Sequence, residues 1–375
     1  MLYKNSIRIG KNTISPNDPV YFIADVASNH DGELGRAREL IYKAKEAGAD
    51  CVKFQHFIAE KIVSDFGFTH LKTGMSHQDS WKKSVFDTYK QCEYVRDWNE
   101  ELTAVAKEVD IEFLTTPYDI DAINGINQYV NAYKIGSGDI TWTEFLLYVA
   151  KMKKPVILST GASDIDDVTR AVDAIKQINQ KIILLQCNTN YTASSENLKY
   201  VNLNVLNTFR SKFPGMILGL SDHTLGYIAV LGAIALGAKV IEKHFTDDCS
   251  RNGPDHKFAM NPCAWKEMVK RSRELEAALG DGIKRVEDNE RDTVIIQRRC
   301  VRFRRDLEVG AVISESDIEI LRPAPENSYP PYALKNVLNR CLKVKKSCGD
   351  ALFFGDISEQ ESGARDLAGI EDMME

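Results

Sequence analysis

Charged side chains occur inside two of the apolar runs of this sequence. Lys53 lies within DCVKFQ and Lys134 within AYKIG, and a lysine is costly to bury unless a negative charge lies beside it. We therefore expect an anion to bind between the two lysines. KIGSGD, at 134–139, adds glycine-flanked amides and a hydroxyl, which suit phosphate oxygens. The sequence lacks a P-loop pattern, so a nucleoside triphosphate is not indicated.

Two histidines, His223 and His244, stand at the ends of the seventh and eighth apolar runs. Imidazoles from neighbouring strands could share one divalent ion and leave positions open for oxygen ligands and water. Asp255, in NGPDHKF, is a candidate third contact, either direct or through water. The alternative is that both histidines only hydrogen-bond to the backbone. An open metal site beside a phosphate pocket predicts Lewis-acid activation of a carbonyl.

Polar residues also follow most of the other apolar runs. Each alone could cap a helix or form a turn, and SNHDG, at 28–32, is most simply the turn into the first helix. Their recurrence at nearly every run favours one shared site. We infer a metal-assisted enzyme that acts on a small substrate carrying phosphate. The further candidates are Asp25, Thr116, Ser137, Ser159, Asn188, Thr189 and Ser221.

Eight apolar, β-branched runs alternate with amphipathic segments, which predicts parallel strands joined by helical crossovers. Eight such units over about 260 residues fit a (β/α)₈ barrel, whose chemistry gathers at the carboxyl ends of the strands. A doubly wound open sheet is the alternative, but it usually has fewer strands, and no GxGxxG follows any run. The predicted strands are 21–26, 50–55, 111–116, 132–136, 155–160, 181–187, 216–221 and 239–244.

The character of the sequence changes after the predicted barrel, which we place at residues 1–280. Residues 281–292 are charged and indicate a linker, 293–358 indicate a small second domain of short strands and turns, and 359–375 an acidic tail. Within the barrel, the long segment 58–99 is either a substrate lid or an inert surface excursion.

Composition narrows the choice of partners and compartment. The 375 residues carry a formal net charge of −6, which disfavours nucleic acid or an anionic membrane as the main partner. The eight cysteines are scattered without a CxxC pair, which fits reduced thiols better than disulfides. We find neither an apolar run near 18 residues nor an apolar signal core at the N-terminus. We therefore predict a cytoplasmic protein.

Several motifs, in this order, resemble the sialic acid synthase (N-acetylneuraminate or nonulosonic acid synthase) family. That family condenses phosphoenolpyruvate with an amino-sugar aldehyde, so the resemblance implies a transferase that forms a carbon–carbon bond. It spans nearly the whole chain and implies a barrel followed by an antifreeze-like (SAF, β-clip) domain, in a domain-swapped homodimer. The motifs are NHDG (29–32), AGADCVKFQ (47–55), YKIGSGD (133–139), ILSTG (157–161), LGLSDHT (218–224), EKHFTDD (242–248) and NGPDHKFAMNP (252–262).

The resemblance also implies a role for each candidate residue. Those that would hold phosphoenolpyruvate are Lys53, Lys134, Ser137, Ser159, Asn188, Thr189 and Ser221. Those that would contact the sugar are Asp139, Tyr191, Asp255 and Arg322. The metal, Mn²⁺ with Mg²⁺ or Co²⁺ as alternatives, would be bound by His223 and His244. The catalytic set would be Asp25, Lys53, Lys134, His223 and His244.

Four departures from the family pattern lie near the expected acceptor and phosphate sites. Asp25 and Asp139 stand where the family usually has glutamate, CNTNY (187–191) replaces a CTNxY-like pattern, and RPAPENS (322–328) replaces RPGxG. From them we predict an acceptor other than plain N-acetylmannosamine. One alternative is another phosphoenolpyruvate-dependent synthase, making a heptulosonate or octulosonate, although those barrels normally lack a C-terminal domain. The other is a non-catalytic sugar-binding homologue.

Overall fold

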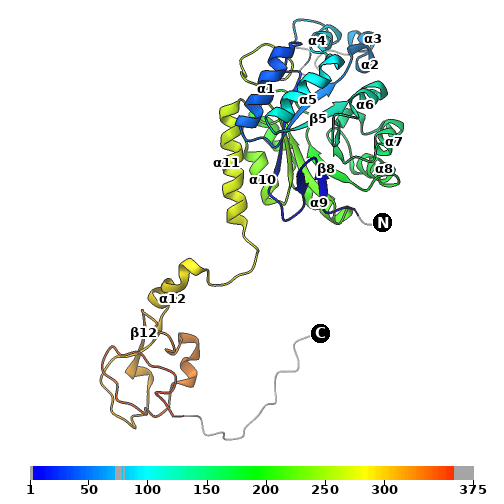
Figure 1. Cartoon of the computed structure of the whole chain (residues 1–375). Helices are drawn as coiled ribbons and strands as arrows, with labels where there is room; N and C mark the ends of the chain where they lie inside the picture. The colour runs from blue at the N-terminus through cyan, green and yellow to red at the C-terminus, as the bar shows by residue number, and fades with distance from the viewer. Residues whose placement is uncertain (1–2, 72–77, 79–80, 359–375) are drawn as a thin grey trace. The chain divides into compact units, whose positions relative to one another are not determined.

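A computed structural model describes residues 3–71, 78 and 81–358, and the chain forms two compact units, 1–281 and 282–375 (Figure 1). The first unit contains an eight-stranded parallel sheet with neighbours in the order β5-β4-β3-β10-β9-β8-β7-β6. Strands β5 and β6 contact each other and complete the ring. The predicted (β/α)₈ barrel is therefore confirmed.

Strands and helices alternate along the barrel as the sequence pattern predicted. The strands are β3 (Tyr21–Ala27), β4 (Cys51–His56), β5 (Glu112–Pro117), β6 (Tyr133–Ile135), β7 (Val156–Ser159), β8 (Ile182–Cys187), β9 (Ile217–Asp222) and β10 (Val240–His244). The helices between and after them are α1 (Leu34–Glu46), α5 (Asn99–Glu108), α6 (Ile120–Ile126), α7 (Thr143–Lys151), α8 (Ile165–Lys176), α9 (Val205–Lys212), α10 (Ile228–Ala235) and α11 (Pro262–Leu279).

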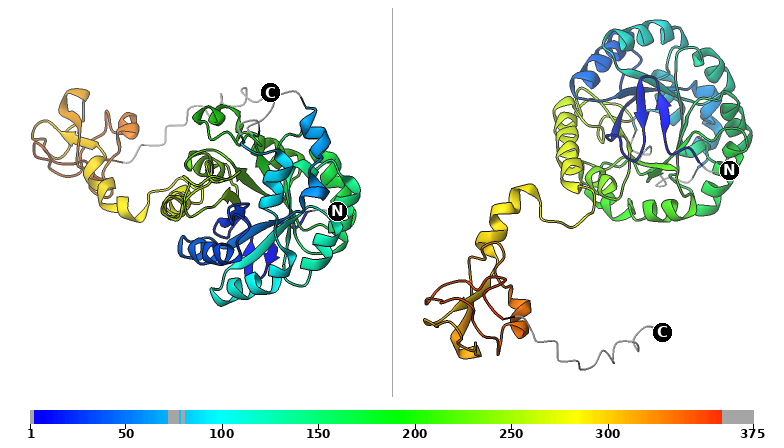
Figure 2. Two further views of the ribbon diagram at one scale, coloured as in Figure 1. Left: turned by 90° about the horizontal axis from the view of Figure 1, so that it is seen from above. Right: turned by 60° about the horizontal axis from the view of Figure 1, so that its bottom comes forward.

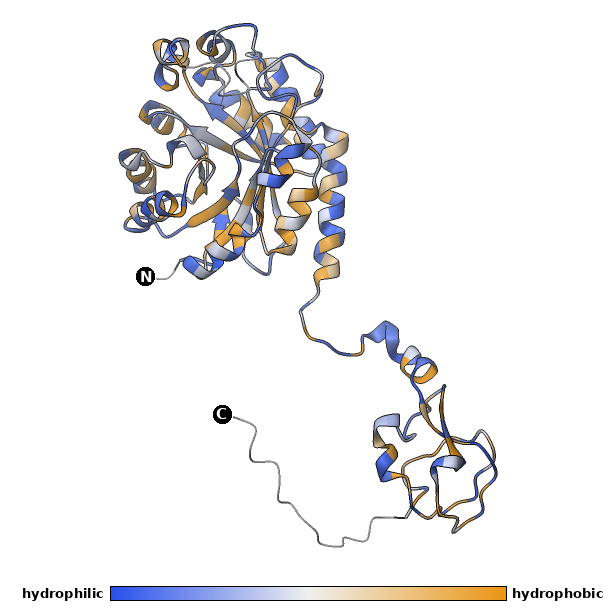
Figure 3. Ribbon diagram, turned by 180° about the vertical axis from the view of Figure 1, so that it is seen from behind, coloured by the Kyte–Doolittle hydropathy of each residue, from blue (hydrophilic) through white to orange (hydrophobic). Residues whose placement is uncertain are grey.

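The apolar strands pack on both of their faces. Successive side chains of a strand point to opposite sides, so Phe22 joins the core between the sheet and the helices, whereas Ile23 joins the core inside the barrel. In Figure 3 the strands are largely hydrophobic, whereas the surrounding helices also carry hydrophilic residues. This double burial explains why the strands appear in the sequence as nearly continuous apolar runs.

An antiparallel hairpin lies across the amino-terminal end of the barrel (Figure 2). It consists of β1 (Ile7–Ile9) and β2 (Asn12–Ile14), whose isoleucines pack against the barrel's inner core. The sequence analysis did not predict this hairpin. It covers the end of the barrel opposite to the carboxyl ends of the strands.

The long segment after β4 has its own secondary structure. It contains α2 (Ala59–Ile62), α3 (Asp65–Thr69), α4 (Val85–Gln91) and the 3₁₀ turn η2 (Arg96–Trp98). Residues of this segment line the cavities described below, so it is more than an inert surface excursion.

The second unit has a hydrophobic core of its own around Val301, Phe303 and Leu352. Strands β11 (Cys300–Phe303) and β12 (Ile318–Leu321) pair antiparallel, after helix α12 (Arg291–Gln297). Its 3₁₀ turns are η5 (Asp288–Glu290), η6 (Glu315–Asp317) and η7 (Pro331–Asn336). The predicted tail, 359–375, lies outside the described residues. In the described part of the chain, every helix is too short or too polar to cross a membrane.

Candidate active site

A cavity of about 220 Å³ opens at the carboxyl ends of the barrel strands. This is the end at which barrels of this type gather their chemistry. It brings together side chains from β3, β4, β5, β6, β9 and β10, and we call it the inner cavity. The sequence-predicted residues that line it are Asp25, Lys53, Thr116, Lys134, Ser137, Tyr191, Ser221, His223 and His244.

One side of the inner cavity is organised by Asp25. Its Oδ2 lies 2.8 Å from Lys53 Nζ and accepts a hydrogen bond from Gln55 Nε2 at 3.2 Å. Directly after Asp25 the pairing of β3 with β4 shifts by one residue, and Ala27 adopts a left-handed φ of 48°. The Ala27 N–H donates to Asp25 Oδ1 at 3.0 Å, so the bulge holds the carboxylate toward Lys53.

A second ion pair of the inner cavity is organised by Glu242, on β10 next to the β3 strand of Asp25. Its Oε1 lies 3.0 Å from Lys134 Nζ and accepts a hydrogen bond from Ser221 Oγ at 3.0 Å. Its second oxygen, Oε2, is buried without a hydrogen-bond partner. Each buried lysine of the cavity therefore already faces a carboxylate of the chain. Burial of the lysines does not by itself require a bound anion.

The ion pairs favour the charged forms of Lys53 and Glu242. Burial lowers the pKa of Lys53, but Asp25 and then Glu242 outweigh it and hold that pKa above its ordinary value. Burial raises the pKa of Glu242, but Lys134 and Lys53 outweigh it and hold that pKa below its ordinary value. The cavity is thus lined by two lysines and two carboxylates in paired contacts.

The two predicted metal ligands lie side by side at the rim of the inner cavity. The ring centroids of His223 and His244 are 5.2 Å apart. His223 Nδ1 is 2.9 Å from the Asn188 carbonyl oxygen, which leaves its Nε2 for a ligand. His244 Nδ1 is buried without a partner, and its Nε2 lies 3.7 Å from Asp25 Oδ2. The two imidazoles, of which His244 has a buried nitrogen without a partner, fit a divalent metal with open coordination positions.

A second cavity of about 120 Å³, the outer cavity, adjoins the inner one. Phe57, Tyr118 and Tyr191 line both. Asp255 lies on the wall of the outer cavity, and its Oδ2 accepts a hydrogen bond from the Ser28 N–H at 3.2 Å. Burial raises the pKa of Asp255 to about 6.

Asp139 and Ser159 are near the inner cavity but not among its lining residues. Asp139 Oδ2 and Ser159 Oγ are both buried without partners. Burial raises the pKa of Asp139 to about 6, although Lys134 partly opposes this. Both groups have capacity for a further hydrogen bond.

Three further predicted residues are Asn188 and Thr189 of the barrel and Arg322 of the second unit. The side-chain amide of Asn188 donates to the Tyr200 carbonyl at 3.2 Å. Thr189 lies beside Gly161, where an added Cβ would be 2.3 Å from its Cγ2. Arg322 belongs to the second unit, where it is exposed after β12. Neither Asn188 nor Thr189 is among the residues that line the inner cavity.

Sequence reasoning missed Glu242 and Gln55, and did not assign Tyr118. A signal for the first two was present, because alternate residues of a strand share a face. Once His244 and Lys53 are assigned to the inside of the barrel, Glu242 and Gln55 must point there too. Tyr118 follows β5 and carried no such signal.

A family model and individual known proteins both match this chain. Residues 40–284 match the model of the NeuB family. The chain is 37% identical over 344 residues to the N,N'-diacetyllegionaminic acid synthase of Legionella pneumophila, covering 90% of this chain and 94% of that protein. It is 30% identical over 327 residues to the N-acetylneuraminate-9-phosphate synthase of Homo sapiens, covering 87% and 89%.

A solved structure resembles the chain as well. It is an N-acetylneuraminic acid synthetase from Leptospira borgpetersenii in complex with citrate, with a TM-score of 0.67 and 28% sequence identity. The match covers 78% of this chain and 96% of that chain.

Proposed function

The chain belongs to the NeuB family, and on that premise we propose that it is a nonulosonic acid synthase. It condenses phosphoenolpyruvate with the open-chain aldehyde of an amino sugar and releases phosphate. The observation that supports this most is the convergence of Lys53, Lys134 and the two neighbouring histidines on one cavity at the carboxyl ends of the strands.

We assign a divalent metal, Mn²⁺ in the first instance, to His223 and His244. When bound there, such an ion supplies Lewis-acid polarisation of the aldehyde oxygen. The inner cavity is otherwise balanced in charge, because Lys53 pairs with Asp25 and Lys134 with Glu242. The highly anionic phosphoenolpyruvate would then enter a cavity with little net charge of its own, and the metal would supply the missing positive charge.

The chain's own groups have distinct tasks in this reaction. The two lysines and the Ser137 and Ser221 hydroxyls hold the phosphate and carboxylate of phosphoenolpyruvate, and the Ser159 hydroxyl, which is buried without a partner, supplies a further phosphate contact. The roles predicted for Asn188 and Thr189 are not kept, because their side chains do not line the inner cavity. The methylene carbon of phosphoenolpyruvate attacks the aldehyde carbon, and water adds to the carbon that bears the phosphate ester. Asp25, the carboxylate beside His244, takes up one proton of that water and returns it to the former aldehyde oxygen, which becomes a hydroxyl. The tetrahedral intermediate then collapses to the ketone: its carbon–phosphate-ester oxygen bond breaks, the proton of its new hydroxyl leaves with the phosphate, and the lysines stabilise the negative charge of the phosphate.

The outer cavity is assigned to the acceptor sugar. Its described lining includes Phe57, Trp81 and Tyr191 together with Asp255, and contains neither lysine nor arginine among the described residues. Aromatic faces suit the C–H faces of a sugar and its acyl methyl groups, whereas a sugar phosphate would lie beside Asp255 without a counter-charge from the described lining of this cavity. We infer an uncharged, N-acylated acceptor other than plain N-acetylmannosamine, also contacted by Asp139 and Arg322.

The test is phosphate release from phosphoenolpyruvate with Mn²⁺ and a panel of acceptors, with product mass as the second readout. The panel contains N-acetylmannosamine, its 6-phosphate, a 2,4-diacetamido-2,4,6-trideoxy sugar, and four- and five-carbon aldose phosphates. We expect release with the diacetamido sugar, little with either phosphate class, and none after chelation. The proposal would be contradicted if only the aldose phosphates caused phosphate release, or if no acceptor of the panel did.

A further inference from the structure

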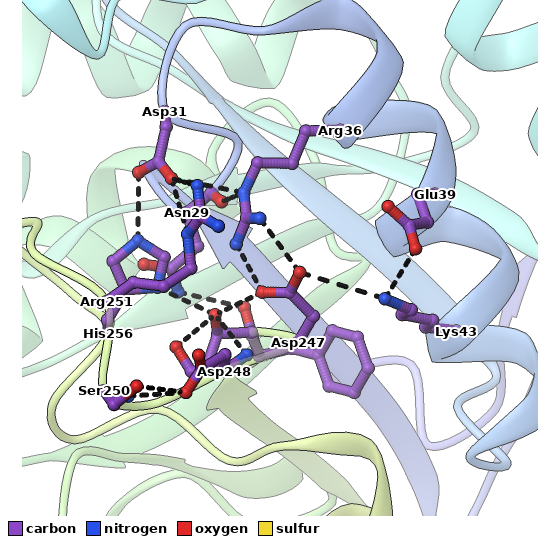
Figure 4. Close-up of polar contacts among 12 residues, drawn as sticks. Asn29, Asp31, Arg36, Glu39, Lys43, Asp247, Asp248, Ser250, Arg251 and His256 are labelled. Carbon is purple, nitrogen blue, oxygen red and sulfur yellow. Dashed lines mark hydrogen bonds and ion pairs between the residues drawn. The ribbon is translucent and has the colours of Figure 1, made fainter.

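The SNHDG turn after β3 leads into α1, but it also contacts the loop between β10 and α11. Asp31, in this turn, has a left-handed φ of 53° and projects its carboxylate toward the loop between β10 and α11 (Figure 4). Its Oδ1 lies 2.9 Å from His256 Nε2, and its Oδ2 accepts from Arg251 Nη2 at 2.9 Å. The first connection of the barrel is therefore tied to the last.

His256 is the inner half of this contact. It is fully buried, and its second nitrogen, Nδ1, lies 2.7 Å from the Thr246 hydroxyl. Gly253 packs so closely that an added Cβ would lie 2.6 Å from His256 Cδ2. Both ring nitrogens are thus engaged, and the ring has little space in which to turn.

The carboxylate of Asp31 is charged in this arrangement. Burial raises its pKa, but His256, Arg251 and Arg36 outweigh burial and hold the pKa below its ordinary value. Arg36 Nε lies 3.2 Å from Asp31 Oδ2, so α1 also contributes a cation.

The loop fixed in this way carries two residues into the site. Asp255, directly before His256, lies on the outer-cavity wall and accepts from the Ser28 N–H. Phe258, two residues after it, is buried, with its ring centroid 4.8 Å from that of His244. We propose that the Asp31–His256 contact is a clamp that positions Asp255 for the acceptor sugar, with Asp31 and His256 as positioning residues that do not touch the substrate.

This inference rests on the proposed function for its kinetic test. In Asp31→Asn, the clamp loses its charge while the shape of the turn is kept. We expect the acceptor KM to rise about tenfold or more, because small misplacements at a reacting centre are costly, while the phosphoenolpyruvate KM changes less than about twofold. Gly253→Ala, which displaces His256 sterically, should give the same split between the two KM values.

Asp247→Asn is the matched control. Asp247 binds Arg36 from the start of the same loop, with a side chain 17% exposed against 20% for Asp31, but within the part of the chain that the structure describes it forms no hydrogen bond or ion pair with His256 or Asp255. We expect it to lower thermal stability as Asp31→Asn does and to leave both KM values unchanged.

A double variant separates positioning from a general structural role. In an Asp255→Asn background, Asp31→Asn should raise the acceptor KM no further, because the clamp acts through Asp255. An equal rise in that background, or an equal rise in both KM values of the single variant, would overturn the clamp.

A readout without substrate keeps the clamp separate from the proposed function. Amide hydrogen exchange in 253–258 should speed up in Asp31→Asn relative to Asp247→Asn. Unchanged exchange would overturn the clamp even if the synthase activity is found, and faster exchange would support it even if no acceptor of the panel reacts.

Discussion

At the scale of single residues, the inner cavity places two lysines and two carboxylates in direct pairs. Removing one partner of such a pair leaves an uncompensated buried charge, whereas the intact pair adds little to stability. Glu242 and Asp25 therefore also have a structural role. They hold Lys53 and Lys134 in place before any substrate arrives.

The buried carboxyl of Asp139 predicts a pH-dependent stability. Burial raises its pKa to about 6 from an ordinary 3.8, so the folded chain binds this proton more tightly than the unfolded chain. The resulting stabilisation is present below about pH 4 and is lost as the pH rises through about 6. Asp139→Asn should therefore match the wild type near pH 4 and exceed it at pH 7.5 by about 1–2 kcal/mol, since partial exposure reduces the full effect.

The measurement is urea unfolding of both proteins at the two pH values. Asp173→Asn, at an exposed position of α8, serves as the control and should change stability by less than about 0.5 kcal/mol at either pH. An Asp139→Asn protein that is less stable than the wild type at pH 7.5 would show that the carboxylate is stabilised by groups other than Lys134.

A functional residue could be predicted from the sequence when the residues next to it in the chain marked it as unusual. Lys53, His223 and His244 stood out because polar residues in or after apolar runs are conspicuous. The clamp did not stand out, because Asp31 and His256 are 225 positions apart and each alone fits a turn. Likewise, Lys53 and Asp25 lie on the paired strands β4 and β3, whereas Lys134 on β6 and Glu242 on β10 lie on strands that do not pair, so that only the closed barrel brings these two side chains together.

At the scale of elements, β9 and β10 determine where Ser221 and His223 lie. Gly219 on β9 allows the two strands to approach, because an added Cβ would lie 2.2 Å from the Val240 carbonyl oxygen and 2.5 Å from Leu185 Cδ2. Gly219→Ala should therefore cost about 1–3 kcal/mol of stability through overpacking. It should also lower kcat, because Ser221 lies two residues further along the same strand.

Gly125→Ala in α6 is the comparison, since an added Cβ there meets nothing within 4 Å. Alanine is favoured over glycine inside a helix by about 0.5–1 kcal/mol, so this variant should gain stability and keep its kcat. Thermal unfolding and steady-state kinetics measure both effects. If Gly219→Ala behaves like Gly125→Ala, the close approach of β9 and β10 does not constrain the site.

The order of the elements was predictable, whereas their ends and additions were less so. The barrel follows from eight repeats of one pattern, and each predicted strand overlaps an observed one. The β1–β2 hairpin was missed because each strand has only three residues, too few for a periodic signal. The short helices after β4 were missed for the same reason.

At the scale of the whole molecule, the barrel and the second unit have separate hydrophobic cores. The core clusters of the barrel contain residues of 1–281 only, and the cluster around Phe303 contains residues of the second unit only. A chain cut after Asp281 should therefore fold, with a thermal transition of its own. If it does, the activity of the cut chain can be compared with that of the full chain. This comparison tests the predicted antifreeze-like domain and the predicted domain-swapped homodimer.

The resemblance to sialic acid synthases assigns Arg322 of the second unit to the acyl group of the acceptor. We therefore predict that the chain cut after Asp281 still binds phosphoenolpyruvate but loses condensation with the N-acylated acceptor. Arg322→Ala in the full chain should raise the acceptor KM about tenfold, the effect of losing about 1.4 kcal/mol of binding, and leave the phosphoenolpyruvate KM unchanged. A cut chain with full activity would instead favour a heptulosonate- or octulosonate-type synthase, because those barrels work without such a domain. Light scattering on both chains tests the dimer directly, since a swapped dimer held by the second unit should become monomeric when that unit is removed.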